Sequence, residues 1–182
     1  MPSLESCGAR FDSVFTVLSN DRTFKGVLET PLDREPPAFL WVENRRLLTV
    51  KRDCIVQLRD VITSRAGEIY AVGASTYAEY GASILYRTHR LFEMNTQVAW
   101  SRQYKTVDPL TGLEKESSTN DLGTVWVAME YTNREDVGRA SHIWQERVVC
   151  ISASELQEGD RIDNREVIRS NVQLGLTVAE LR

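Results

Sequence analysis

Five carboxylates near the end of the chain are the residues with the clearest capacity for chemistry. Two carboxylates held at a fixed separation can act as the acid and base of glycoside hydrolysis. Here the acids stand among turn residues with no aromatic-lined cleft indicated, so solvated turns are the favoured interpretation. A hydrolase using Glu155 and Glu158 is the enzymatic alternative. In an assembly the same acids could meet a basic loop of a neighbour or line an acidic channel. The five are Glu155, Glu158, Asp160, Asp163 and Glu166.

Histidines and cysteines are the other reactive side chains, and their spacing argues against a metal site. His89 and His142 have no second ligand at metal spacing, and we interpret both as surface or sheet-edge residues. The cysteines are Cys7, Cys54 and Cys150, an odd number without a CxxC pair. Cys54 and Cys150 lie in apolar stretches typical of buried thiols in a reducing compartment. A Cys150–His142 nucleophilic pair is disfavoured because an apolar strand opposes a thiolate.

Composition places the chain among ordinary globular proteins. It has 182 residues, of which 42% are hydrophobic and 26% charged, with a net charge of −4. This balance argues against a general nucleic-acid or anionic-membrane surface, which needs clustered Lys and Arg. No phosphate-binding glycine loop, nucleophile elbow or zinc-protease motif occurs. The sequence therefore predicts a non-enzyme without cofactor or metal. It also predicts a soluble protein made in a cytoplasm, without an export signal or membrane span.

Short apolar stretches separated by Gly, Asp and Asn dominate the chain. They recur about every 8–12 residues, and no long helical pattern occurs, which is the signature of an all-β sandwich or small antiparallel barrel. The segment 133–138 is polar and predicts a turn, and 31–37 is proline-rich and predicts a connector. The strands predicted before residue 152 cover 11–18, 23–28, 39–42, 47–50, 54–61, 69–72, 84–92, 125–131 and 143–151.

A weak internal repeat predicts two similar tandem β units. The segments 58–87 and 151–181 both place a glycine turn, a strand, a second glycine and a last strand in the same order. The glycines are Gly67 and Gly81 in the first copy, Gly159 and Gly175 in the second, displaced by 92 and 94 residues. The predicted organisation is an N-terminal unit over 1–92 with a flexible N-terminal arm over 1–11, an irregular connector with an exposed loop over 93–121 and a C-terminal unit over 122–182. Packing of the whole chain as a single domain is the alternative.

The polar stretch 105–121 predicts a long exposed loop, and such loops in small β proteins often carry contacts. Trp126 and Trp144 lie in apolar strands and are interpreted as core, whereas Trp100 stands at the start of the irregular segment, where an interface is favoured. The candidate interface residues are Trp100, Asp108, Leu110, Leu113, Glu114, Lys115 and Glu116.

The segment 158–181, EGDRIDNREVIRSNVQLGLTVAEL, combines a Gly-Asp turn, a short strand, a valine-centred strand, a glycine and a terminal strand. The segment 67–72, GEIYAV, repeats the turn and the strand. In this arrangement the chain resembles the small β-barrel neck proteins of tailed bacteriophages, the head-closure and head–tail joining proteins. The resemblance covers about a third of the chain, and the chain is longer than a single-barrel member.

The resemblance implies a structural virion protein located in the neck. Such a protein forms a homo-oligomeric ring, twelve-fold or six-fold by family analogy, between the portal with its adaptor and the tail. It would retain packaged DNA, which passes the acidic channel without specific binding. Within the virion the alternative is a tail terminator or minor tail protein. From another class, the alternative is a carbohydrate- or peptide-binding β module that uses exposed Trp and Tyr.

Overall fold

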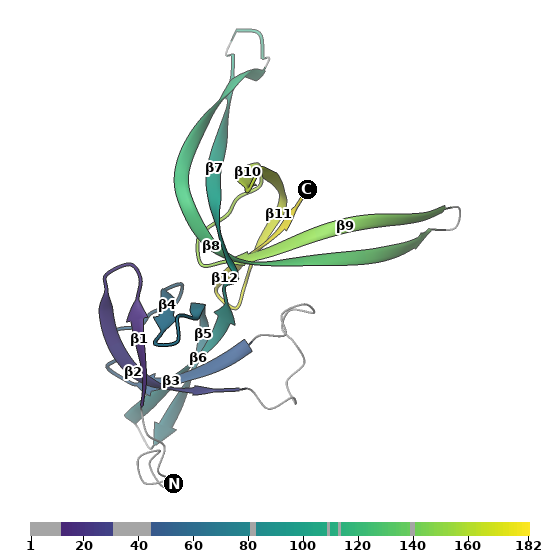
Figure 1. Cartoon of the computed structure of the whole chain (residues 1–182). Helices are drawn as coiled ribbons and strands as arrows, with labels where there is room; N and C mark the ends of the chain where they lie inside the picture. The colour runs from purple at the N-terminus through teal and green to yellow at the C-terminus, as the bar shows by residue number, and fades with distance from the viewer. Residues whose placement is uncertain (1–11, 31–44, 81–82, 109, 113, 139–140) are drawn as a thin grey trace. The chain divides into compact units, whose positions relative to one another are not determined.

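The computed structural model describes residues 12–30, 45–80, 83–108, 110–112, 114–138 and 141–182. Twelve β-strands and no helix form this part of the chain, which confirms the predicted all-β class (Figure 1). Over these ranges there is accordingly no helix with the length and hydropathy needed to cross a membrane. The predicted N-terminal arm over 1–11, the proline-rich connector 31–37 and the predicted strand at 39–42 lie outside the described residues.

The first six strands close into an antiparallel barrel, the first barrel. Its strand order is β1-β2-β3-β6-β5-β4, and β4 pairs back with β1 to close the ring. The predicted strand over 54–61 is wrong in its bounds, because that segment is mostly a turn-rich approach and the strand begins at Val61. The strands are β1 (Ser13–Val17), β2 (Arg22–Glu29), β3 (Arg45–Lys51), β4 (Val61–Ser64), β5 (Ile69–Tyr80) and β6 (Ser83–Glu93).

The last six strands close into a second barrel. Its order, β10-β11-β12-β9-β8-β7, closes through pairing of β10 with β7. The segment predicted as an irregular connector, 93–121, is mostly strand, and the predicted turn at 133–138 belongs to β8. The strands are β7 (Thr96–Val107), β8 (Glu114–Gly138), β9 (Ser141–Ser152), β10 (Asp160–Ile162), β11 (Arg165–Gln173) and β12 (Leu176–Leu181).

The two barrels have the same topology. Adding six to each strand number of the first barrel gives the strand order of the second, with the same antiparallel neighbours. Contacts between residues divide the chain in the same way. One compact unit comprises 1–94 with 174–176, and the other comprises 95–173 with 177–182. The chain therefore consists of two tandem six-stranded β units, as the repeat predicts.

The structural repeat has a different register from the one that the glycines predict. Gln57 and Asp60 stand just before β4, and Gln157 and Asp160 stand at the start of β10, at a displacement of 100 residues. In each copy the Asp Oδ2 accepts the Gln backbone N–H, at 2.8 Å and 2.9 Å, and the Asp N–H returns to the Gln carbonyl. The displacement of 92 is wrong because Gly67 lies in the β4–β5 turn, whereas Gly159 lies before β10.

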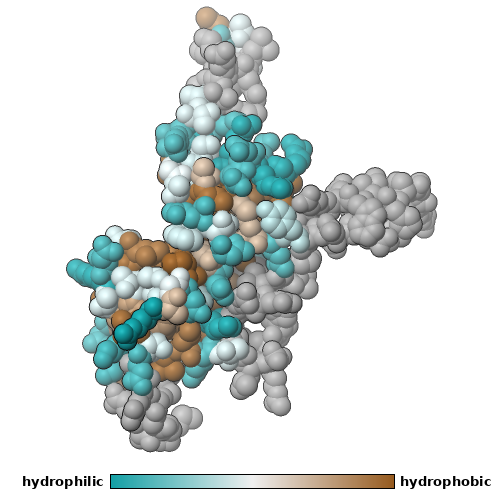
Figure 2. Space-filling model, in the orientation of Figure 1, coloured by the Kyte–Doolittle hydropathy of each residue, from teal (hydrophilic) through white to brown (hydrophobic). Residues whose placement is uncertain are grey.

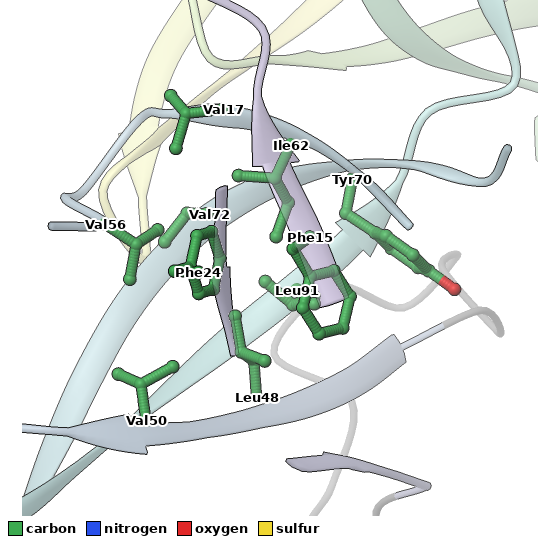
Figure 3. Packing of buried hydrophobic residues seen from close by; sticks show 10 residues of the cluster. All are labelled: Phe15, Val17, Phe24, Leu48, Val50, Val56, Ile62, Tyr70, Val72 and Leu91. Carbon is green, nitrogen blue, oxygen red and sulfur yellow. The ribbon is translucent and has the colours of Figure 1, made fainter. Parts of the chain in front are cut away.

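The barrel interiors are filled differently. In the first barrel Phe15 and Phe24 stack with ring centroids 5.5 Å apart, and Tyr70 lies beside them in the same core (Figure 3). In the second barrel the fully buried residues are aliphatic or small, and Trp100 and Met129 pack only partly against them. Buried aromatics carry the largest apolar area per residue, so the first core is the more densely apolar of the two.

Candidate functional site

Strand β8 takes part in two hairpins that extend past the second barrel. It pairs with β7 over 114–127 and with β9 over 127–138. Only part of each hairpin pairs with a third strand of the barrel. The pairing of β10 with β7 ends at Arg102, and the pairing of β12 with β9 ends at Val148. The described pairings therefore leave two two-stranded ribbons, the first ribbon over 103–119 and the second ribbon over 132–147 (Figure 1).

The first ribbon is an extension that the first barrel lacks. Val17 and Trp100 are equivalent because they pair with Ile62 and Ile162, which end matching Gln-x-x-Asp-x-Ile segments. From Val17 the first barrel turns back at once, and Val17 pairs with Arg22 across four residues. From Trp100 the chain runs outward, and Trp100 pairs with Gly123 across twenty-two.

A buried carboxylate holds the base of the first ribbon. Asp160 is only 1% exposed, and its Oδ1 lies 2.7 Å from Arg102 Nε in β7. Arg102 Nη2 donates to Asp160 Oδ2 at 3.0 Å, and Trp100 Nε1 donates to the same oxygen at 3.1 Å. Arg102 also donates to the Glu155 carbonyl at 3.2 Å. A carboxylate bound by a guanidinium fork and an indole fixes both the direction and the register of β7 where the ribbon leaves the barrel.

The charge state of Asp160 follows from these donors. Burial alone would raise its pKa, but the hydrogen bonds from Arg102, the Gln157 backbone and Trp100 outweigh that effect and lower the pKa below its usual value. Asp160 is therefore ionised at neutral pH and forms an ion pair with Arg102. The interpretation of this acid as a solvated turn residue is wrong, because the β7 extension covers it.

The tip of the first ribbon is a short, internally bonded turn. Asp108 Oδ1 accepts the Leu110 N–H at 2.9 Å, and the Asp108 carbonyl accepts the Gly112 N–H at 2.9 Å. Gly112 has φ +66°, a conformation that favours glycine. The turn presents Leu110 to solvent with 94% of its surface exposed. The turn therefore holds a large apolar side chain in solvent at the end of the described ribbon.

The structure places the predicted interface residues at the ribbon base, in the tip turn and at the start of β8, and one lies outside the described residues. Trp100 lies at the ribbon base, half-buried, with its indole bonded to Asp160, so part of it is structural. Asp108 and Leu110 form the tip. Glu114 and Lys115 begin β8 opposite Val107 and Thr106, Glu116 follows them, and Leu113 lies outside the described residues.

The other reactive side chains do not gather into a site. His89 is buried in β6 at 2% exposure rather than at the surface, and neither ring nitrogen has a hydrogen-bond partner. Burial, and then the charge of Arg87, lower its pKa to about 4. Cys150 is buried in β9, and burial raises its pKa to about 12, so it remains a thiol. Cys54 is half-buried in a loop, and the His142 side chain lies outside the described residues.

The acids Glu155 and Glu158 are exposed, as the solvated-turn interpretation predicts. Among the residues that the structure describes, no three His, Cys, Asp or Glu side chains lie close enough to hold a metal ion together. The sequence signal for the ribbon base was the Gln-x-x-Asp repeat, which the glycine alignment misses. Comparison with known protein families, with curated proteins and with solved structures found no match.

Proposed function

We propose that this chain is a structural protein of a tailed-phage virion, a head-to-tail connector that forms a homo-oligomeric ring in the neck. The ring joins the portal and its adaptor to the tail and helps to retain DNA. The proposal starts from the resemblance of 158–181 to neck proteins. The observation that carries it further is the first ribbon, a two-stranded extension anchored by a buried ion pair.

A ribbon of this kind needs a partner. Two strands without a third strand or a packed face are marginally stable in water, and their outer edges carry unpaired N–H and C=O groups. The first ribbon has five β7 residues beyond Arg102, so it reaches about 17 Å from its base at roughly 3.4 Å per residue. Anchoring such an arm through Asp160 and Arg102 has a physical use if another subunit receives it.

Charge supports passage of DNA rather than its capture. The chain carries 26 acidic and 22 basic residues, so a ring of many copies is strongly acidic. Phosphate is repelled by such a surface, whereas stable DNA binding needs basic contacts. A connector must let DNA through without holding it, and the sign of the net charge suits that task.

The proposed role involves no catalysis and needs no cofactor. The acids suggested for hydrolysis lie exposed in turns, and a catalytic acid is usually held in a site that raises its pKa. Saturable binding of a glycan or a peptide by the chain would instead favour the alternative function, a carbohydrate- or peptide-binding β module.

Phages that lack the gene provide the direct test. They should yield DNA-filled heads and free tails that do not join, and supplying the protein should restore joined particles. Cryo-electron microscopy of the restored particles should show a ring of twin β-barrels between the portal adaptor and the tail. A ring at the upper end of the tail tube would instead identify a tail terminator. Infectious virions made without the protein would overturn the proposal.

A further inference from the structure

A cavity of about 390 Å³ opens on the first barrel, at the end of β3. Phe24, Cys54 and Ile55 supply apolar surface, and Lys25 and Lys51 stand at the rim together with Asp53. Figure 2 shows hydrophobic residues at the surface of the first barrel, and Ile55 is one of the exposed large ones, at 38%. We call this cavity the socket. Its size is in the range that binds a protruding side chain or small ligand.

The tip of the first ribbon, residues 108–116, has the complementary properties. It presents Leu110, which is 94% exposed, on a turn bonded through Asp108. The tip sequence contains three acids, Asp108, Glu114 and Glu116, against one base, Lys115. The socket rim has two bases against one acid. The tip sequence is therefore net acidic and the socket lining net basic, so the two are complementary in charge.

We propose that the tip of the first ribbon docks into the socket of a second copy of this chain, with Leu110 on the apolar floor. This rests on the proposed ring function and names its subunit contact. Each copy gives one tip and offers one socket, so the contact is heterologous. Repetition of such a contact gives a ring when the rotation between successive copies closes, as the proposed function requires. The tip lies in the second barrel unit and the socket in the first, so both units are used.

Disulfide trapping tests the contact. Leu110→Cys is made in a Cys7→Ser background, so that a docked tip places its thiol beside Cys54 in the socket of the next copy. Mild oxidation should give a ladder of disulfide-linked oligomers on non-reducing gels. Cys54→Ser should abolish the ladder, and Cys150 provides no alternative because it is fully buried. Leu110→Ala should weaken association about thirtyfold, the amount expected for one buried leucine.

Charge reversal gives an independent readout by sedimentation velocity. Lys25→Glu should weaken association about fivefold, as expected for loss of a rim charge pair. Glu114→Lys in the same chain should restore part of it. Arg169→Glu, an exposed change in β11, is the matched control and should have no effect.

The outcomes separate this contact from the ring proposal. A ring without a Leu110→Cys ladder would overturn the contact and leave the ring standing. A fast-migrating cross-linked monomer, independent of concentration, would show that the tip meets the socket of its own chain and would also overturn it. Neither ring nor ladder, in solution or in particles, would contradict both.

Discussion

The first barrel closes its leading hairpin with four residues, whereas the second barrel extends the matching hairpin by a ribbon that a buried ion pair holds. The Asp of the Gln-x-x-Asp turn shows how this difference is built. Asp60 is half-exposed and satisfies its own turn. Asp160 makes the same turn bond and also binds Arg102 and Trp100 of β7, at the base of the first ribbon. The same Gln-x-x-Asp turn therefore lies beside a hairpin that closes at once in the first barrel and anchors an extended hairpin in the second.

The cores differ in the same sense. The first barrel has stacked aromatics and one buried histidine, and the second has smaller aliphatic residues and a buried ion pair. We infer that the first barrel derives its stability mainly from apolar packing, whereas the second depends more on polar anchoring. Substitutions at matched positions of the two barrels test this difference.

The largest difference is expected between Phe15→Ala and Val98→Ala, which lie two residues before the matched Val17 and Trp100. Loss of a buried, stacked phenylalanine should cost about 4 kcal/mol of unfolding free energy, and loss of the buried valine about 2 kcal/mol. Hydrogen exchange read separately for peptides of each barrel measures both. Equal losses would contradict the view that aromatic packing dominates the first barrel.

Asp160→Asn and Asp60→Asn sharpen the comparison of the two turns. Asp160→Asn removes the charge that binds a guanidinium in a buried position, and should destabilise the second barrel by about 3 kcal/mol. Asp60→Asn leaves a half-exposed turn bond and should cost less than about 1 kcal/mol. Denaturation of the full chain, with hydrogen exchange to assign the loss, provides the measurement. Similar costs would show that Asp160 has no role beyond its turn.

Acid should destabilise the first barrel before the second. His89 stays neutral in the folded protein down to its pKa of about 4, whereas in the unfolded chain it takes up a proton below about pH 6.5. His89 therefore does not affect the free energy of unfolding above pH 6.5 and lowers it as the pH falls toward 4. That shift corresponds to about 3 kcal/mol. Asp160 has a lowered pKa, so its contribution is present above the pKa of the unfolded state and is lost only at lower pH.

His89→Leu is the control for this pH dependence. His89 pairs with Leu48 of β3. The strand registers that start from the equivalent Val17 and Trp100 make Leu48 equivalent to Cys150. Cys150 pairs with Ala179, so Ala179 is the residue of the second barrel that matches His89. The substitution should remove the slope of first-barrel stability between pH 6.5 and 4 and leave the second barrel unchanged. A slope that persists in His89→Leu would assign the acid sensitivity to another group.

The smallest effect concerns backbone strain before β4 and β10. Arg59 has φ +70° where its counterpart, Gly159, has φ +86°. Gly159→Ala meets no atom within 4 Å, so its cost comes only from the left-handed conformation, about 1 kcal/mol. Thermal unfolding should show a drop of a few degrees. No change would mean that the turn can relax into another conformation.

Regular alternation made part of the fold predictable. Burial alternates over 125–128, within the predicted strand 125–131, and 176–181 forms the whole of β12, so both strands follow from the sequence. The turn at Asp163 and Asn164 has positive φ at both residues, which Asp and Asn tolerate well. These local signals sufficed for the all-β class and for two tandem units.

The ribbons could not be predicted by the same argument. Strand periodicity arises from one buried face, and a two-stranded ribbon beyond the barrel has no core to bury one against. The polar stretches 114–120 and 133–138 therefore read as a loop and a turn, although both are strand. The burial of Asp160 depends on Arg102, which lies 58 residues earlier, and no local pattern encodes that contact.

We propose that the first ribbon mediates assembly, whereas the two barrels fold without it. The most direct test replaces residues 104–118 by Asn-Gly, which keeps Arg102 with Asp160 and closes Gln103 onto Thr119 with a two-residue turn. Sedimentation velocity of this variant and the natural chain, over a range of concentrations, measures the outcome. We predict that the natural chain forms a ring-sized species and that the shortened chain stays folded but monomeric. A shortened chain that assembles as the natural one does would contradict the account.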